Sequence, residues 1–210
     1  MKQEVLFEQI KKHKIVPVVK IDRVDDTKPL CKALSDGGLP VAEITFRTAA
    51  AEESIRIATA AFPEMLIGAG TIVNVEQARR AVAAGAAFLV SPGFSKPVVE
   101  FALANLIPIF PGACTPSELM QLLAYDLRVA KFFPAGQFGG LATIKALAAP
   151  FPDMLFMPTG GISASNIRDF LAFDKIIACG GSWMVKDSLV QEGDFVRIRQ
   201  LTQEAVALAQ

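Results

Sequence analysis

The sequence predicts an α/β fold, a (β/α)8 TIM barrel with an extra N-terminal helix. Eight short apolar runs rich in Val, Ile and Phe recur about every 20–26 residues, with longer, alanine-rich segments between them. The runs are nearly continuous in apolar residues, which is typical of strands covered on both faces in a parallel sheet. A doubly wound open sheet shares this alternation, but eight regular repeats in 210 residues favour the barrel, and no GxGxxG motif follows the first run.

The predicted elements follow one another along the chain. The extra N-terminal helix is expected over residues Met1 to Lys12. The first helix between strands is expected to end at Asp36-Gly37-Gly38. No linker or change of composition divides the series, so the sequence predicts a single domain over residues 1–210. The predicted strands, in order, are IVPVVK from Ile15, VAEITF from Val41, MLIGAG from Met65, AFLVS from Ala87, IPIFPG from Ile107, VAKFF from Val129, MLFMPTGG from Met154 and KIIACGG from Lys175.

Two of the helices between strands carry start signals. Asn74 and Gln77 predict a capping box, and Gly85 predicts the end of the same helix. Thr115 and Glu118 have the spacing of an N-cap and the acidic residue three positions later. These starts mark where the loops after the strands end, and in βα barrels those loops carry the functional residues.

The composition excludes several classes of function. The 21 basic and 21 acidic residues give a formal net charge of zero, which argues against nucleic acid or an anionic membrane as partner. The apolar stretches are interrupted well before the length of a membrane span. Cys31, Cys114 and Cys179 are scattered, and no secretory leader is recognisable. We therefore expect a cytoplasmic protein with free thiols.

The single histidine also limits the chemistry. His13 lies in the basic stretch KKHK and is interpreted as a solvated residue at a helix end. With only this histidine, the chain cannot form a histidine triad or a multi-histidine metal site by itself. No metal and no cofactor are predicted.

Lys131 is the unusual residue among those near the predicted strand ends. It lies inside VAKFFP, between Ala130 and Phe132, which would leave its ammonium in the barrel interior, where charge is costly. Burial favours the free amine, and a free amine in an apolar pocket can attack a ketone carbonyl. The alternative is a lysine that extends to solvent or forms a structural salt bridge, and the residues of this strand do not decide between the two.

The second predicted strand ends in Glu43, Thr45 and Arg47. Glu43 is a single carboxylate in an apolar run; facing the barrel mouth, it could act as general base and acid and pair with Lys131. The alternative is a structural carboxylate bound by the local backbone or by Arg47. Arg47 follows four residues later on the same side of an extended strand, and its planar guanidinium suits a substrate carboxylate, although arginine at a strand end is often a surface residue.

Glycine pairs follow the last two predicted strands. PTGGIS from Pro158 and CGGSW from Cys179 let backbone N–H groups approach an anion closely, and a helix N-terminus after each loop would add a favourable dipole. Phosphate sites of βα barrels are frequently found here, so the pair of motifs predicts phosphate binding. Thr71 and Thr159 supply hydroxyls at strand ends, which is a weak signal when each is taken alone.

Together these motifs resemble one enzyme family. VPVVK, EITFRT, IGAGT, VSPGF, PGACTPSEL, KFFPA, PTGGI and GGSW fall, over essentially the whole chain, in the order and spacing of the 2-keto-3-deoxy-6-phosphogluconate (KDPG) aldolases, also called KDPG/4-hydroxy-2-oxoglutarate aldolases. The resemblance implies a compact βα barrel, a homotrimer, and a class I aldolase that needs no metal.

The resemblance also implies a role for each matched residue. Lys131 matches the lysine that forms the Schiff base, and Glu43 matches the general acid and base. Arg47 and Thr71 match contacts to the pyruvate carboxylate, and Thr159 matches a threonine that orients the substrate. The remaining matches are the pocket-lining Pro92 and Phe133 and the phosphate-binding Gly160, Gly161, Gly181 and Ser182.

The sequence thus predicts a lyase that reversibly cleaves KDPG to pyruvate and glyceraldehyde 3-phosphate, as in the Entner–Doudoroff pathway of carbohydrate metabolism. The galactonate epimer and 4-hydroxy-2-oxoglutarate, which would give pyruvate and glyoxylate, remain alternatives. Gly136 replaces the family's acidic residue after KFFPA and leaves the preferred substrate tail open. Two further hypotheses are an isomerase or synthase in which Lys131 is only an electrostatic clamp, and a non-catalytic phosphosugar-binding barrel.

Overall fold

Parallel strands form where the repeated apolar runs predict them. The computed structural model describes residues 3–210, with side chains from residue 5 onward. Every strand ladder in this part of the chain is parallel, as near-continuous apolarity predicts. The strands are β1 (Ile15–Val19), β2 (Val41–Thr45), β3 (Leu66–Gly70), β4 (Phe88–Val90), β5 (Ile109–Phe110), β6 (Val129–Phe132), β7 (Leu155–Pro158) and β8 (Cys179–Gly181).

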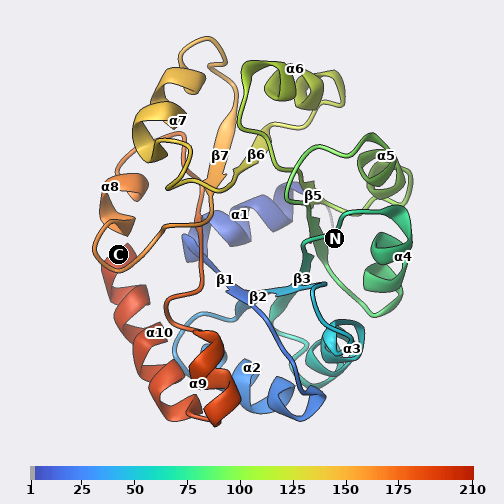
Figure 1. Cartoon of the computed structure of the whole chain (residues 1–210), viewed down its shortest axis with the longest axis vertical. Helices are drawn as coiled ribbons and strands as arrows, with labels where there is room; N and C mark the ends of the chain where they lie inside the picture. Colours follow the sequence, from blue (N-terminus) through green and yellow to red (C-terminus); the bar gives the residue numbers. More distant parts are fainter. Residues whose placement is uncertain (1–2) are drawn as a thin grey trace.

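Helices surround the strands (Figure 1). α1 precedes β1 and packs against the interior: Leu6 and Ile10 are buried, and the ring of Phe7 lies 5.3 Å from that of Phe110, centroid to centroid. The helices are α1 (Gln3–His13), α2 (Thr27–Asp36), α3 (Ala51–Ala61), α4 (Val75–Ala83), α5 (Lys96–Ala104), α6 (Pro116–Ala124), α7 (Gly140–Ala148), α8 (Ile167–Leu171), α9 (Asp187–Glu192) and α10 (Phe195–Ala209), with a 3₁₀ turn η1 (Val24–Asp26).

The strands form a curled parallel sheet. Six of them are ordered β5-β4-β3-β2-β1-β8, and β6 pairs with β7 in a second ladder. Isolated parallel bridges join the two ladders, from Gly112 to Lys131 after β5 and from Thr159 to Gly180 beside β8. The fold class is therefore α/β with a curled parallel sheet, and the carboxyl ends of the strands lie at one end of it.

The interior is filled by large side chains that glycines accommodate. Every residue of β2 and β3 is buried, and Phe88 and Phe110 meet edge to face with ring centroids 5.8 Å apart. A Cβ added to Gly68 would lie 2.2 Å from the Phe88 ring. A larger residue at position 68 is therefore excluded, because the Phe88 ring occupies the space that its Cβ would need.

Two predicted boundaries differ from the structure. β8 begins at Cys179 instead of Lys175, because the N–H of Ile176 donates to Phe173 O in the preceding turn and Ile176 forms only an isolated bridge with Phe156. α1 continues one residue past Lys12, to His13. Residues 1–2 of the predicted first helix lie outside the described residues.

The helix starts largely follow the predicted signals. Asn74 Oδ1 accepts from the N–H of Gln77 at 2.9 Å, but the Gln77 side chain accepts from the N–H of Val73 and so does not complete a capping box with Asn74. Thr115 and Glu118 form the full capping box. α2 and α4 end at the predicted Gly37-Gly38 and Gly85 signals, with Gly38 and Gly85 at positive φ.

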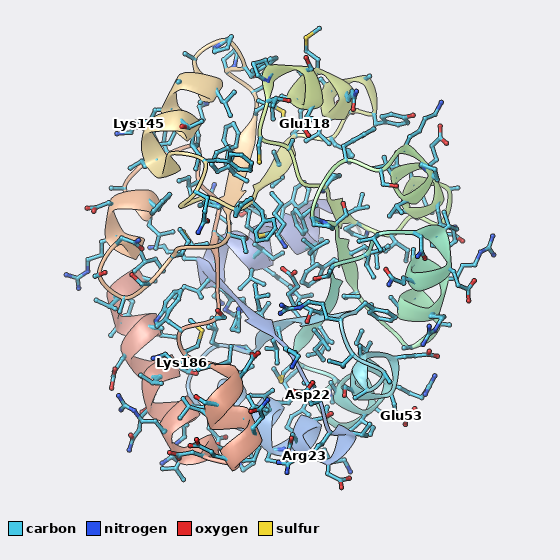
Figure 2. The ribbon with its side chains drawn as sticks, viewed as in Figure 1. Asp22, Arg23, Glu53, Glu118, Lys145 and Lys186 are labelled. Carbon is cyan, nitrogen blue, oxygen red and sulfur yellow. The ribbon has the colours of Figure 1, made fainter. Side chains whose placement is uncertain are left out.

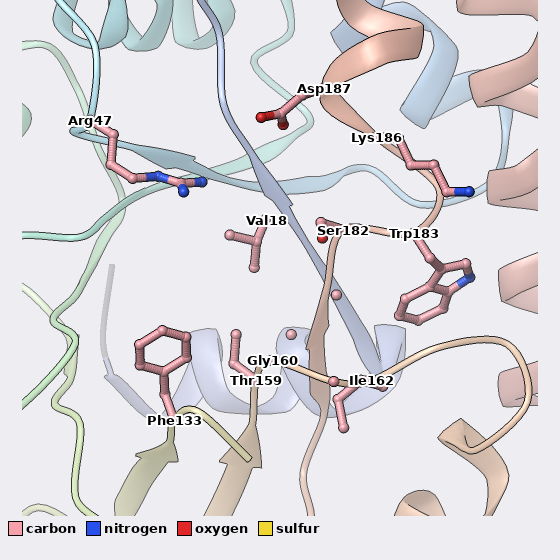
Figure 3. Close-up of a pocket in the computed structure, with 13 residues that line it drawn as sticks. Val18, Arg47, Phe133, Thr159, Gly160, Ile162, Ser182, Trp183, Lys186 and Asp187 are labelled. Carbon is pink, nitrogen blue, oxygen red and sulfur yellow. The ribbon is translucent and has the colours of Figure 1, made fainter. Parts of the chain in front are cut away.

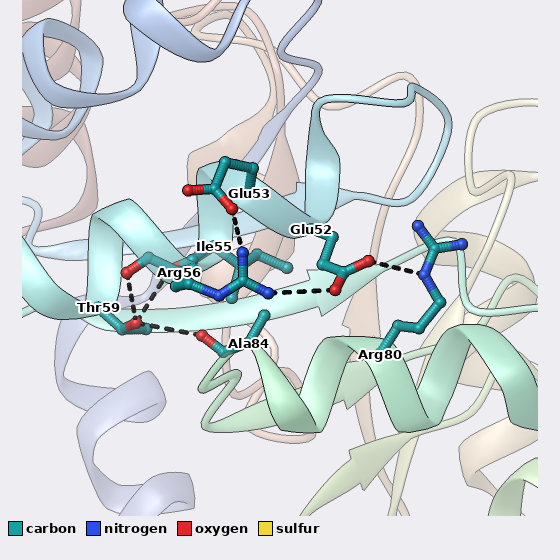
Figure 4. Close-up of polar contacts among 7 residues, drawn as sticks. All are labelled: Glu52, Glu53, Ile55, Arg56, Thr59, Arg80 and Ala84. Carbon is teal, nitrogen blue, oxygen red and sulfur yellow. Dashed lines mark hydrogen bonds and ion pairs between the residues drawn. The ribbon is translucent and has the colours of Figure 1, made fainter.

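Charged side chains lie mainly on the outside, as the labelled Glu53, Glu118 and Lys145 illustrate in Figure 2. Figure 4 shows an exposed network in which Glu52 of α3 accepts from Arg56 of the same helix and from Arg80 of α4. Such exposed pairs each contribute little to stability. In residues 3–210 no helix combines the length and the apolarity needed to cross a membrane.

The three cysteines are free thiols, as expected from their spacing. Burial raises the pKa of Cys31 and of Cys179 to about 12. Cys114 is half-buried, and its Sγ donates to the backbone oxygen of Phe133 at 3.0 Å. His13 ends α1 as predicted, but it is half-buried rather than solvated, and burial together with the charge of Lys12 lowers its pKa.

We expect Asn74→Ala to lower the free energy of unfolding by about 1 kcal/mol, because the first turn of α4 loses its N-cap acceptor. Ser95→Ala is the matched control, since Ser95 is the N-cap of α5 but makes no side-chain capping bond. Urea denaturation of both variants measures the difference. An equal loss in the two variants would show that the Asn74 bond does not stabilise α4.

Candidate active site

Lys131 and Glu43 form a buried ion pair between β6 and β2. Lys131 Nζ lies 3.1 Å from Glu43 Oε1, and the two side chains are 5% and 0% exposed. The lysine therefore does not extend to solvent, and the carboxylate pairs with Lys131 instead of Arg47. These two residues, predicted separately from the odd charges in their apolar runs, meet inside the curled sheet.

The neighbouring backbone fixes Lys131 in place. Its N–H donates to Pro111 O at 2.9 Å, and its carbonyl oxygen accepts from the N–H of Ala113 at 3.0 Å. Its Nζ also lies 5.4 Å from the centre of the Phe133 ring, within the range of a cation–π interaction. The lysine is thus anchored on one side by the loop after β5 and faces the aromatic ring two residues later.

The carboxylate is confined equally closely. A Cβ added to Gly70, at the end of β3, would lie 2.0 Å from Glu43 Oε1, so only glycine leaves room for the carboxylate here. The other oxygen, Oε2, is buried without a hydrogen-bond partner among the described residues. A buried polar atom of this kind is costly and frequently marks a functional position.

A cavity of about 490 Å³ opens at the same end of the sheet (Figure 3). Lys131 and Glu43 are buried and do not line it. Phe133 connects the two regions, because it belongs both to the cavity wall and to the surroundings of Lys131. The cavity is lined by Val18, Arg47, Phe133, Thr159, Gly160, Gly161, Ile162, Gly180, Gly181, Ser182, Trp183, Lys186 and Asp187.

The two glycine loops form one wall of this cavity, as the paired motifs predict. Gly160 and Gly161 have φ values of 88° and 79°, a region that favours glycine. A Cβ on Gly181 would lie 1.9 Å from the ring of Trp183, so this glycine makes room for the indole. α8 begins only at Ile167, beyond the residues that line the cavity, so the first loop offers its backbone and not the predicted helix N-terminus. After the second loop, the start of α9 at Lys186 and Asp187 does line the cavity.

Thr159 and Arg47 also reach the cavity. Gly180 makes room for Thr159, because a Cβ there would lie 2.3 Å from Thr159 Oγ1. Arg47 follows the end of β2 at Thr45 and lies in a turn, so the predicted strand alternation does not extend to it. Figure 3 shows its guanidinium directed into the cavity. Its Nε donates to Thr45 Oγ1 at 3.1 Å.

Two predicted site residues lie at the same end of the sheet but outside the cavity wall. Thr71 follows β3 with a φ of 58°, and Pro92 follows β4; both are half-buried. Gly136 lies against the Gly160 loop, where its N–H donates to Gly160 O at 2.9 Å. Across the described chain, no group of three or more His, Cys, Asp or Glu side chains could hold a metal ion.

Sequence reasoning did not single out several cavity residues, among them Trp183, Lys186 and Asp187. Trp183 carries the clearest signal, since it is the one tryptophan of the chain and directly follows a predicted glycine loop. Asp187 points into the cavity, whereas Lys186 points away from Arg47 (Figure 3). Both charged residues lie at the start of α9, where charge is common on any helix.

Comparisons with known proteins identify the class. The family model described as "KDPG and KHG aldolase" matches residues 6–201. The 2-dehydro-3-deoxy-phosphogluconate aldolase of Treponema pallidum is 42% identical over 203 residues, which are 97% of each chain.

Two solved structures agree with this result. The KDPG aldolase of Legionella pneumophila, with pyruvate captured as a covalent carbinolamine, has a TM-score of 0.92 and 36% identity over 95% of this chain and 97% of its own. The 2-keto-3-deoxy-6-phosphogluconate aldolase of Zymomonas mobilis ZM4, with 3-phosphoglycerate, has a TM-score of 0.90 and 35% identity over 96% of this chain and 95% of its own.

The fold, the buried pair and these relatives define an enzyme of the lyase class. The chain belongs to the KDPG and KHG aldolase family.

We expect Gly70→Ala to separate Lys131 from Glu43 beyond 4 Å, because the new methyl group takes the place of the carboxylate. Overpacking of this kind also costs on the order of 1–3 kcal/mol of stability. Gly93→Ala is the control, since an added Cβ there meets nothing within 4 Å. Crystal structures and urea denaturation of both variants test this. A Gly70→Ala structure with the 3.1 Å contact intact would contradict the steric argument.

Proposed function

We propose that this chain is a class I aldolase that cleaves KDPG to pyruvate and glyceraldehyde 3-phosphate through a Schiff base on Lys131. The observation that carries the proposal is the Lys131–Glu43 contact of 3.1 Å inside the curled sheet. It combines a nucleophilic amine with a proton acceptor in a site that excludes most water. The covalent carbinolamine described for the Legionella enzyme supports the same chemistry here.

Formation of the Schiff base uses both members of the pair. Glu43 accepts a proton from the Lys131 ammonium, and the free amine attacks C2 of the substrate to give a carbinolamine. Glu43 then returns the proton to the C2 hydroxyl, which leaves as water, and the product is an iminium ion. The contact with Glu43 thus makes the lysine a nucleophile while keeping the charge of the pair balanced.

Cleavage uses the iminium ion as an electron sink. Glu43, directly or through a water molecule, removes the proton of the C4 hydroxyl; Oε2, which has no partner among the described residues, supports a role as this acceptor. The electron pair of the C3–C4 bond moves toward the iminium nitrogen, and the aldehyde leaves. The remaining enamine takes a proton at C3, and hydrolysis of the resulting iminium releases pyruvate and restores Lys131.

The remaining predicted site residues bind the two anionic ends of the substrate. Arg47, with its guanidinium directed into the cavity, and Thr71, which follows β3, hold the carboxylate beside Lys131. Phe133, near Lys131 Nζ, and Pro92, which lies against Gly112, enclose the ketone. Thr159 orients the reacting carbons. The phosphate lies against the glycine-loop wall, made by Gly160, Gly161, Gly181 and Ser182.

The loop wall also favours a phosphorylated tail over a short one. The Zymomonas structure, which is described with 3-phosphoglycerate, supports a phosphate site in the family. Unphosphorylated 4-hydroxy-2-oxoglutarate is the second candidate substrate, because the matching family model includes KHG aldolases. The galactonate epimer of KDPG is a third, since it presents the same carboxylate, ketone and phosphate to the site.

We further infer a closed (β/α)8 barrel in which residues 1–210 form one domain. The bridges at Gly112–Lys131 and Thr159–Gly180 support closure, because they lie at the two junctions between the ladders. Association into a homotrimer and a cytoplasmic location remain predictions from the resemblance and the composition.

Lys131→Arg tests the Schiff base while preserving the positive charge beside Glu43. We expect borohydride with pyruvate to modify the wild-type chain at Lys131, and the arginine variant to lose both this modification and aldol cleavage. Lys145→Ala is the control, because this exposed lysine also lies near a ring, 5.6 Å from the centre of Phe173. This variant should keep wild-type trapping and cleavage. Absence of both trapping and KDPG cleavage in the wild-type chain would favour the isomerase or synthase hypothesis, in which Lys131 is only an electrostatic clamp.

Steady-state kinetics with three substrates tests the tail preference. We expect kcat/KM for KDPG to exceed that for 4-hydroxy-2-oxoglutarate by about 10- to 100-fold, the value of one charge-assisted hydrogen bond to the phosphate. The galactonate epimer serves as the comparison with an equal charge. Equal kcat/KM values for KDPG and 4-hydroxy-2-oxoglutarate would remove the phosphate from the proposal but not the Schiff base.

A further inference from the structure

A buried threonine holds the arginine of the cavity in position. Thr45 is the last residue of β2 and is almost completely buried. Its Oγ1 donates to Val19 O of β1 at 3.0 Å and accepts from Arg47 Nε at 3.1 Å. We propose that Thr45 is a positioning residue that orients the Arg47 guanidinium toward the substrate carboxylate. The proposal rests on the carboxylate-binding role of Arg47 proposed above.

The hydroxyl is suited to this role because its direction is fixed. A threonine hydroxyl has one hydrogen to donate, and the carbonyl of Val19 takes it. The lone pairs are thereby left for the N–H of Arg47 Nε, and the branched Cβ of threonine restricts rotation of the side chain. Both partners of Thr45 lie close to it, one on the neighbouring strand and one in the next turn.

The contact leaves the binding side of the arginine free. Guanidinium has five N–H donors in one plane, and Thr45 uses only the one on Nε. Within residues 5–210, the two terminal nitrogens of Arg47 make no hydrogen bond or ion pair. Holding Nε sets the plane of the group, so that both terminal nitrogens face the cavity as a bidentate fork (Figure 3).

A nearby carboxylate does not take over the arginine. Hydrogen bonds from Lys20 and Gln191 lower the pKa of Asp22, and the charge of Arg47 contributes a smaller part of the same shift. Lys20 Nζ lies 2.8 Å from Asp22 Oδ2, and Gln191 Nε2 lies 3.2 Å from the same oxygen. Asp22 is therefore satisfied by other donors, and Thr45 is the residue that decides where Arg47 points.

A comparison with Thr48 tests whether the role of Thr45 is purely structural. The hydroxyl of Thr48 also ties the turn after β2 to the loop after β1, by donating to Ile21 O, but it makes no hydrogen bond to the Arg47 side chain. If tying these segments together were all that mattered, removal of either hydroxyl would affect the site equally. Positioning of Arg47 predicts that only the change at Thr45 weakens carboxylate binding.

The experiment measures the pyruvate concentration that gives half-maximal borohydride trapping. We expect Thr45→Val to raise it about three- to tenfold, as for the loss of one hydrogen bond. Thr45→Ser should restore most of the affinity, and Thr48→Val should leave it unchanged. In an Arg47→Ala background, Thr45→Val should have no further effect, because its target is gone. Thr45→Ala replaces the valine variant if the latter does not fold.

Three results would overturn the inference. One is a Thr45→Val variant with the wild-type pyruvate dependence. The second is an equal weakening by Thr45→Val in the presence and in the absence of Arg47. The third is a wild-type chain that is not trapped at any pyruvate concentration. This result would overturn both the Schiff-base function and the inference about Thr45, whereas the first two results would overturn the inference alone.

Discussion

The contact between Lys131 and Glu43 is the interaction on which the site depends. Neither charge could remain inside the sheet alone, because removing one partner of a buried pair costs about 3–5 kcal/mol. Each strand therefore tolerates its charged residue because the other strand supplies the opposite charge. The pair is also incomplete, since one carboxylate oxygen has no partner among the described residues. Leaving a buried oxygen unpartnered costs stability, and positions of this kind frequently have a function.

Small residues make this arrangement possible. Gly70 leaves room for the carboxylate, Gly180 for Thr159 and Gly181 for the indole of Trp183. At each position the ideal Cβ would overlap a side chain of the site, so these glycines are required by what lies beside them and not by the shape of a turn. The same sheet end is thus crowded around the Lys131–Glu43 pair and open at the loop wall, where an anion can approach backbone N–H groups.

The strands and the two buried charges could be predicted because their signals lie in short stretches of the sequence. Apolar runs predicted every strand, and the odd charges in two of them predicted Lys131 and Glu43. What could not be predicted is which of several available partners a group takes. Two cases are local, namely the turn at Phe173–Ile176 that delays β8 and the hydrogen bond from the N–H of Val73 to the Gln77 side chain. The third, the link from Val19 through Thr45 to Arg47, joins distant segments. In the sequence Thr45 is an ordinary strand threonine, and its role appears only when β1 lies beside β2.

Trp183 gives the molecule a built-in optical probe. It is the single tryptophan of the chain, and its ring forms part of the cavity wall above Gly181. An indole at such a boundary between solvent and protein changes its emission when the polarity around it changes. Tryptophan fluorescence of the unlabelled enzyme therefore arises from one defined place, next to the loops that would receive a bound anion, and occupancy of the cavity can be followed without adding a dye.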